Sequence, residues 1–137
     1  MKAEDLIGTW RAAGHEILNK DGTVSRPFGP GPHLGNIVYH PNGTVSVLVL
    51  RADLKKLALP ASAEEKVAAV GQCVAYQGRY EVKDDTVIHH VEVSLNPAWI
   101  GTSQARKAVL DGNRLTLSPP ADEKGAVPRI TWERVAR

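Results

Sequence analysis

Apolar and polar residues alternate along most of this chain in short segments that are separated by turn residues. Eight segments show the pattern: residues 8–18, 35–40, 44–51, 75–82, 86–94, 104–110, 114–118 and 129–135. Gly, Pro, Asn and Asp recur between them at the short, regular spacing that is typical of an antiparallel sandwich or barrel. The segments do not alternate with helices, as a parallel sheet would require. The pattern therefore predicts one all-β domain over residues 1–137.

One stretch, residues 61–74, has a helical period instead. Ser62 and Glu65 are spaced as a capping box. Val67 and Val74 belong to a single, narrow apolar stripe along one face. We therefore expect this short helix to pack on the strands as a plug and not to bind a partner.

A two-residue turn at Asp84 and Asp85 fixes which residues face one another across the hairpin that it joins. On the apolar face it pairs Val82 with Val87, Tyr80 with His89, Gly78 with Val91 and Tyr76 with Val93. On the solvent face it pairs Glu81 with Ile88, Arg79 with His90 and Gln77 with Glu92. The register directs His89 and Tyr80 inward and His90 outward.

The turn after Asp111 sets Leu110 against Leu115, and Arg106 shares their inward face. An inward arginine is costly unless it is paired or lies near an open end. Arg106 is therefore either an anchor for an anionic group of a ligand or a residue that caps the end of the barrel. The sequence leaves both alternatives open.

Composition and charge exclude several classes of partner. The net charge is only +2 and the basic residues are scattered among acidic ones, so we expect no nucleic-acid partner. No stretch approaches 18 apolar residues and the first residues lack an apolar leader, so we expect no membrane partner and a cytoplasmic location. Cys73 is the only cysteine, and we interpret it as a small buried hydrophobe.

Two motifs resemble the lipocalin signature. They are Gly8-Thr9-Trp10 in the first strand and Thr131-Trp132-Glu133-Arg134 in the last. In that signature the Trp closes the barrel floor and the Arg packs over it. The run from Tyr76 to Leu117 is similar to the lipocalin-like domain family of bacteria and fungi, with matches such as Tyr76-Gln77-Gly78-Arg79-Tyr80 and Leu110-Asp111-Gly112-Asn113-Arg114-Leu115. Ser46 departs from the family pattern, in which a larger apolar residue is expected, and either widens the pocket or marks a bulge.

The resemblance implies a fold and leaves the chemistry open. The fold is an all-β, eight-stranded antiparallel up-and-down β-barrel of lipocalin-like type with one short helix. Such barrels enclose one small organic molecule, and the wider group contains both carriers and enzymes. A homodimer is left open.

Metal, hydrolytic and nucleotide chemistry lack support in the sequence. His89 and His90 leave opposite faces of one strand, and His15, His33 and His40 have no metal-binding spacing. A Gly-x-Ser-x-Gly motif is missing. We therefore expect no metal and no cofactor.

The Pro-rich segment 26–33 is expected to connect across one end of the barrel, or to cover it.

What remains is an apolar pocket with a few polar groups inside it. We expect the ligand to contact Tyr39, Tyr76, Trp99, Val91 and Leu117. The sequence supports two functions: a barrel that carries a small, largely apolar metabolite or is purely structural, and a barrel that also catalyses cofactor-free isomerisation, cyclisation or dehydration.

The catalytic hypothesis gives three residues a role. In it His89 moves a proton, Arg106 binds a carboxylate or developing oxyanion, and Tyr80 orients one or the other. The simpler interpretation, which we favour, makes His89 a core histidine bonded to Tyr80 or to a backbone carbonyl.

Overall fold

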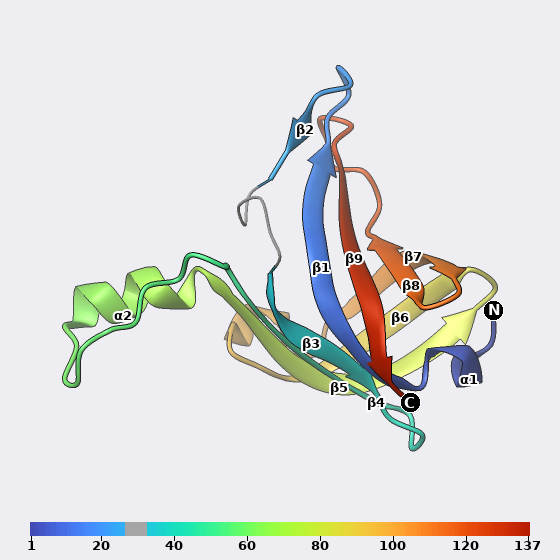
Figure 1. The fold of residues 1–137 in the computed structure, drawn as a ribbon, viewed down its shortest axis with the longest axis horizontal. Coiled ribbons are helices and arrows are strands. Elements are labelled where there is room, and N and C mark those ends of the chain that lie inside the picture. The colour runs from blue at the N-terminus through green and yellow to red at the C-terminus, as the bar shows by residue number, and fades with distance from the viewer. Residues whose placement is uncertain (27–32) are drawn as a thin grey trace.

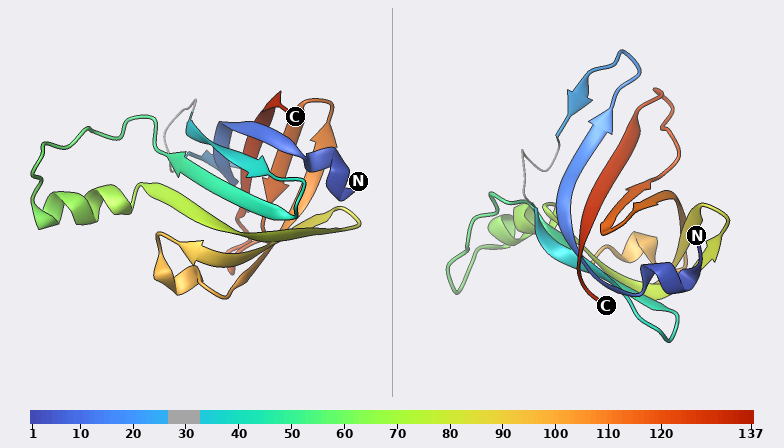
Figure 2. Two further views of the ribbon diagram at one scale, coloured as in Figure 1. Left: turned by 90° about the horizontal axis from the view of Figure 1, so that it is seen from below. Right: turned by 45° about the vertical axis from the view of Figure 1, so that its right-hand side comes forward.

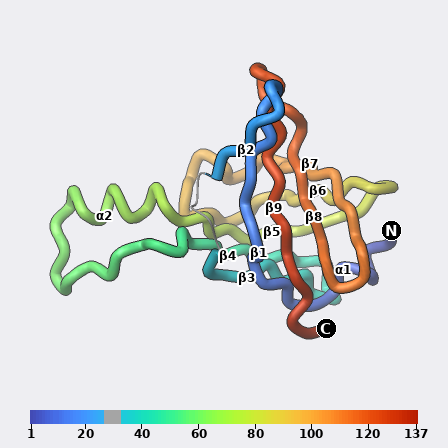
Figure 3. Tube along the Cα trace, turned by 45° about the horizontal axis from the view of Figure 1, so that its top comes forward, coloured from blue at the N-terminus to red at the C-terminus, as the bar shows by residue number. Residues whose placement is uncertain are grey.

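Each long strand of the barrel pairs with the next along the chain (Figure 1). The computed structural model describes residues 1–26 and 33–137, and the bounds below refer to that part of the chain. The barrel strands are β1 (Gly8–Leu18), β3 (Leu34–Tyr39), β4 (Thr44–Leu50), β5 (Cys73–Lys83), β6 (Thr86–Ser94), β7 (Ser103–Asp111), β8 (Arg114–Ser118) and β9 (Val127–Ala136). The last strand returns to pair antiparallel with the first, side by side in Figure 3, which closes the sheet. The predicted eight-stranded up-and-down barrel is confirmed.

The remaining elements are short. They are α1 (Ala3–Leu6), β2 (Val24–Ser25), α2 (Ala63–Val70) and the 3-10 helix η1 (Pro97–Trp99). Residues 27–32, most of the Pro-rich segment, lie outside the described residues, so the expectation for that segment is not addressed. Among the described residues, no helix is both long and apolar enough to cross a membrane.

A bulge changes the predicted register in the second half of the β5–β6 hairpin. Near the turn the pairs Val82–Val87, Tyr80–His89 and Gly78–Val91 form as predicted. Beyond a shift between Gln77 and Gly78, however, Tyr76 faces Ser94 and Gln77 faces Val93. The predicted pairs Tyr76–Val93 and Gln77–Glu92 are therefore wrong, because an extra residue in one strand moves every later partner. As a consequence Val93 is 62% exposed.

The predicted helix forms, but it is shorter than expected and does not pack on the barrel. The capping box is present, with the Glu65 amide donating to the Ser62 hydroxyl at 3.1 Å. The helix ends at Val70, and Val74 already belongs to β5. None of the described residues of α2 is buried and Val67 is 74% exposed. Both views in Figure 2 show α2 extending away from the sheet, so the prediction of a plug is wrong, because the apolar stripe loses Val74 to a strand.

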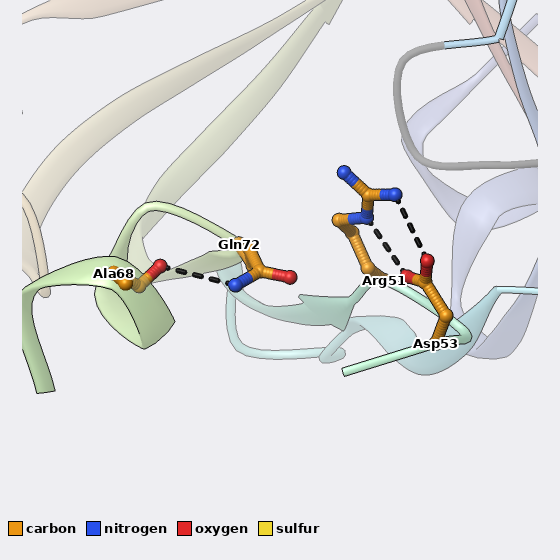
Figure 4. A network of polar contacts seen from close by, with 4 residues as sticks. All are labelled: Arg51, Asp53, Ala68 and Gln72. Carbon is orange, nitrogen blue, oxygen red and sulfur yellow. Dashed lines mark hydrogen bonds and ion pairs between the residues drawn. The ribbon is translucent and has the colours of Figure 1, made fainter. Parts of the chain in front are cut away.

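Polar contacts stabilise the two segments that join α2 to strands β4 and β5 (Figure 4). The guanidinium of Arg51 donates two hydrogen bonds to the Asp53 carboxylate, at 2.9 and 3.0 Å. The Gln72 side chain donates to the Ala68 carbonyl at 3.1 Å. These contacts fix where the chain leaves β4 and where it enters β5.

The closed end of the barrel is built on Trp10. This indole is fully buried and donates to the Leu6 carbonyl at 2.8 Å. Arg134 from β9 covers its ring and donates to the carbonyls of Ile7 and Asp5, at 2.7 and 2.6 Å. The floor arrangement that the signature implies is confirmed, and it holds the segment before β1 against the barrel.

Candidate ligand-binding site

Three strands bring together a hydrogen-bonded group around His89 in the barrel interior. His89 on β6 is 2% exposed. Its Nε2 lies 2.8 Å from the hydroxyl of Tyr39 on β3, and its Nδ1 lies 2.7 Å from the hydroxyl of Tyr76 on β5. Both ring nitrogens therefore have a partner, as buried polar groups require.

Tyr80 is not a partner of His89, although the two residues face each other across the hairpin. The Tyr80 hydroxyl donates to the His40 carbonyl at 3.1 Å. Its ring packs edge-on against Tyr39, with centroids 4.8 Å apart. His89 is a hydrogen-bonded core histidine, as the sequence indicated, but its partners are Tyr39 and Tyr76 and not Tyr80 or a backbone carbonyl. The partners differ because a tyrosine hydroxyl reaches well beyond its cross-strand neighbour.

Burial keeps this group neutral. It lowers the pKa of His89 to about 3, and Arg106 and His90 act in the same direction. Burial raises the pKa of Tyr76 to about 12 and also raises the pKa of Tyr39. A neutral imidazole has one donor and one acceptor nitrogen, so one tyrosine donates to the ring and the other accepts from it.

Arg106 lies next to this group on β7, half-buried. It donates to the Gln104 side chain at 2.9 Å and to the Ala105 carbonyl at 3.0 Å. Burial lowers its pKa, whereas Tyr76 and Tyr39 raise it. In turn, the guanidinium acts to lower the pKa of both phenols, against the larger effect of their burial.

The other residues predicted to contact a ligand occupy the same interior. Trp99, half-buried in η1, packs edge-on against Tyr76, with centroids 6.2 Å apart. Val91 and Leu117 are buried in the core at 2% and 4% exposure. The structure thus brings the predicted aromatic and polar residues together, but packs them closely.

An apolar cavity of about 80 Å³ lies beside this group. Its lining residues among those described are Ala12, Gly14, His15, His33, Val47, Val49, Val74, Ile130 and Trp132. Val47 is the cross-strand partner of Tyr76, so the cavity begins next to the tyrosine and histidine group.

A more polar pocket of about 170 Å³ shares Gly14, His15 and His33 with the cavity. The two spaces therefore adjoin at these residues. The rings of His15 and His33 meet edge to face, with centroids 6.4 Å apart. Burial, followed by the influence of His33, lowers the pKa of His15.

Sequence reasoning considered His15 and His33 only as metal ligands and did not place Trp132 in a cavity. The available signal was the run Ala12-Ala13-Gly14 before His15, because small side chains on a barrel strand leave space inside. Within the described residues, no group of three or more His, Cys, Asp or Glu side chains could hold a metal ion.

A wider groove of about 680 Å³ lies on the outer face of β3 to β6. Leu48 and Val93 line it and are more than half exposed. Ser46 also lines it, since it alternates with the buried Val45 and Val47. Ser46 therefore neither widens the interior nor marks a bulge; its hydroxyl accepts from Gln77 at 3.1 Å. The groove lies on the outer face of the sheet, whereas the cavity is lined by residues that face the barrel interior, such as Val47 and Trp132.

Comparisons with known proteins agree with this architecture. The chain is 37% identical over 86 residues to an Aspergillus oryzae protein, ppsC, named as a 4'-hydroxy-3'-methoxypropiophenone carrier protein; the match covers 54% of this chain and 78% of that protein. The crystal structure of a lipocalin-like protein from Bacteroides uniformis superposes with a TM-score of 0.52 at 16% identity, covering 95% of this chain and 98% of that one. Residues 7–135 match the family model described as lipocalin-like domain. The chain therefore belongs to the lipocalin-like domain family.

Proposed function

We propose that this barrel is a carrier that binds one small, largely apolar organic molecule in its interior. The observation that carries the proposal is the apolar cavity that Trp132 and Val47 line inside a closed barrel. Small-molecule sites are typically concave and apolar with a few polar groups. The relative named as a carrier of a hydroxy-methoxy aryl ketone supports the same function. A small aromatic ketone is the ligand class that fits both observations.

The size of the cavity restricts how such a ligand would lie. A cavity of about 150 Å³ takes up a benzene ring, whereas this one measures about 80 Å³. One end of the ligand would therefore occupy the cavity. The remainder would extend past His15 and His33 into the adjoining pocket of about 170 Å³. Binding on this route would bring the ligand into contact with both imidazole side chains.

Tyr39, Tyr76, Val91 and Leu117 do not line the cavity, but in this proposal they support it, because they pack in the same core as Val47 and Trp132, which do line it; Trp99 packs against Tyr76. The hydrogen bonds between His89 and the two tyrosine hydroxyls hold their rings in place. A rigid wall lowers the entropy that binding must offset.

Calorimetry and thermal melting with propiophenone and ring-substituted analogues test the proposal. We expect one molecule bound per chain and a melting temperature that rises with ligand concentration, as for any ligand that binds the folded state. The absence of both effects across aryl ketones and apolar fluorescent probes would leave a purely structural barrel.

Cofactor-free isomerisation, cyclisation or dehydration is the second function that we propose to test. The hydrogen-bonded chain Tyr39–His89–Tyr76 favours it, because an imidazole between two phenols can relay a proton. His89 would move the proton and Arg106 would hold a carboxylate or oxyanion. Tyr80 would orient the reacting group through the ring of Tyr39, against which it packs.

The state of His89 places this function second. An imidazole with a pKa of about 3 and both nitrogens bonded is a weak base at neutral pH. Turnover of a candidate ketone by the wild type and by His89→Ala decides the matter. Catalysis by His89 predicts a rate loss of about 10²–10⁴-fold, and equal rates would remove the mechanism.

A further inference from the structure

The indole of Trp132 is a buried hydrogen-bond donor with no acceptor in the described part of the chain. Trp132 lies on β9, facing Ala12 on β1 and Leu115 on β8, and is 2% exposed. Its Nε1 has no hydrogen-bond partner among the described residues. An indole N–H only donates, and leaving a buried donor unpaired costs free energy that a phenylalanine in its place would not incur.

Trp10, a second buried indole of the barrel, has an acceptor within the protein. Trp10 donates from Nε1 to the Leu6 carbonyl at 2.8 Å, so the fold supplies an acceptor where the indole serves the floor. Trp132 instead lines the internal cavity. The missing acceptor and the empty space therefore occur at the same residue.

We propose that Trp132 Nε1–H donates a hydrogen bond to a neutral carbonyl oxygen of the bound ligand, and so selects ketones over hydrocarbons of the same shape. This inference rests on the proposed carrier function and names the residue that reads the ligand. The indole supplies the donor, and the apolar walls around it hold the carbon skeleton.

The lining of the cavity favours a neutral oxygen over an anion. The described residues that line it include no Lys or Arg. Burial and the neighbouring His33 lower the pKa of His15, which disfavours its charged form. A carboxylate would therefore be buried beside the indole without a counter-charge, which is far more costly than burying a carbonyl with one hydrogen bond.

The test compares propiophenone with propylbenzene, which has a methylene where the ketone has its carbonyl. Affinities of both compounds are measured by calorimetry for the wild type and for Trp132→Phe. Comparing the ratio of the two affinities between the wild type and the variant cancels the difference in hydrophobicity between the compounds. We expect Trp132→Phe to reduce the preference for the ketone by about tenfold, the value of one buried hydrogen bond.

Trp10→Phe is the matched control, because it removes an indole N–H whose acceptor is protein. It should leave the ratio unchanged even where it lowers the melting temperature. An equal ratio in the wild type and in Trp132→Phe, with both compounds bound, would overturn the inference while the carrier function stands; this is the result expected if water satisfies the indole. Binding of neither compound nor any apolar probe would overturn both.

Nuclear magnetic resonance of the wild type provides a second measurement that does not depend on how the variant folds. The chain has three tryptophans, so the indole N–H spectrum is simple to assign. We expect the Trp132 indole proton to shift downfield with propiophenone and to shift less with propylbenzene. Equal shifts with the two compounds would contradict the hydrogen bond.

Discussion

The guanidinium carbon of Arg134 lies 4.1 Å from the centroid of the Trp10 ring. The first strand of the barrel thereby contacts the last through a cation–π interaction, in addition to their backbone pairing. The same guanidinium donates to two carbonyls in the segment before β1. Its planar shape allows all three interactions at once, which an ammonium cannot reproduce.

Arg134→Lys should therefore lower the free energy of unfolding by about 1–3 kcal/mol, because it removes the stacking and at least one of the two hydrogen bonds. Urea denaturation measures the change. Arg11→Lys is the matched control on the opposite strand, since Arg11 forms an exposed ion pair with Glu133 and should cost less than about 1 kcal/mol. Equal losses for both variants would mean that Arg134 acts only as a surface charge.

The buried state of His89 predicts an acid-sensitive barrel. The pKa of His89 is about 3 in the folded chain, against an ordinary value of 6.5. Between these values the unfolded chain holds one more proton, so stability is full above pH 6.5 and falls as the pH is lowered toward 3. The slope from this residue is about 1.4 kcal/mol per pH unit.

Denaturation of the wild type and of His89→Gln between pH 7.5 and 4 isolates that slope. Glutamine also has a donor and an acceptor, but it does not titrate. The phenols beside His89 have a raised pKa and Arg106 carries a guanidinium, so none of these three groups titrates in this range. His90, which also acts on His89, is present in both proteins, so its contribution cancels in the comparison. We expect the wild type to lose more stability than the variant below pH 6.5; parallel curves would show that His89 is not buried in the neutral form.

Gly78 lies at the bulge, where the backbones of β5 and β6 approach too closely for a larger side chain. A Cβ at Gly78 would overlap the carbonyl oxygen of His90 on the neighbouring strand. Gly78→Ala must therefore separate β5 from β6 or abolish the bulge, and should cost about 2 kcal/mol or more. Thermal melting measures the loss.

Gly71→Ala is the control for this prediction. Gly71 follows α2 with a right-handed helical backbone, and its added Cβ would meet only an ordinary contact, 3.7 Å from the Ala68 carbonyl. It should be neutral or stabilise the chain by about 0.4–1 kcal/mol. A small effect at both glycines would mean that the close approach of the two strands is not required.

The sequence predicted the barrel because a strand repeats every two residues and a tight turn fixes its register. His89 and Val91 therefore point inward as expected. The register beyond Gly78 could not be predicted, because a bulge depends on how closely two backbones approach. The exposure of α2 depended on where the helix ends, which its capping box does not determine.

The cavity was beyond sequence reasoning for a different reason. Its volume depends on side chains from β1, β4, β5 and β9 together, such as Ala12, Val49, Val74 and Trp132. The pattern of one strand says which side chains face inward, but not whether those of the opposite strands meet. Polar inward residues such as His89 indicate a site in the sequence, whereas the space lies beside small and apolar ones.

Filling the cavity should separate binding from stability. Val74 is half-buried on β5, lies opposite Val49 and lines the cavity with it. Val74→Phe should place a ring in that space and weaken binding of propiophenone by about tenfold or more, equivalent to about 1.4 kcal/mol. The free energy of unfolding should change by less than about 1.5 kcal/mol, because the ring enters a void and does not displace packed atoms.

Val109→Phe is the control, because it introduces the same ring on β7 at a residue that is 55% exposed, and it should leave the affinity unchanged. Because the two variants have the same composition, a difference in affinity reports the position of the ring alone. Unchanged binding by both would move the ligand out of this cavity and leave the outer groove of β3 to β6 as the next site to test.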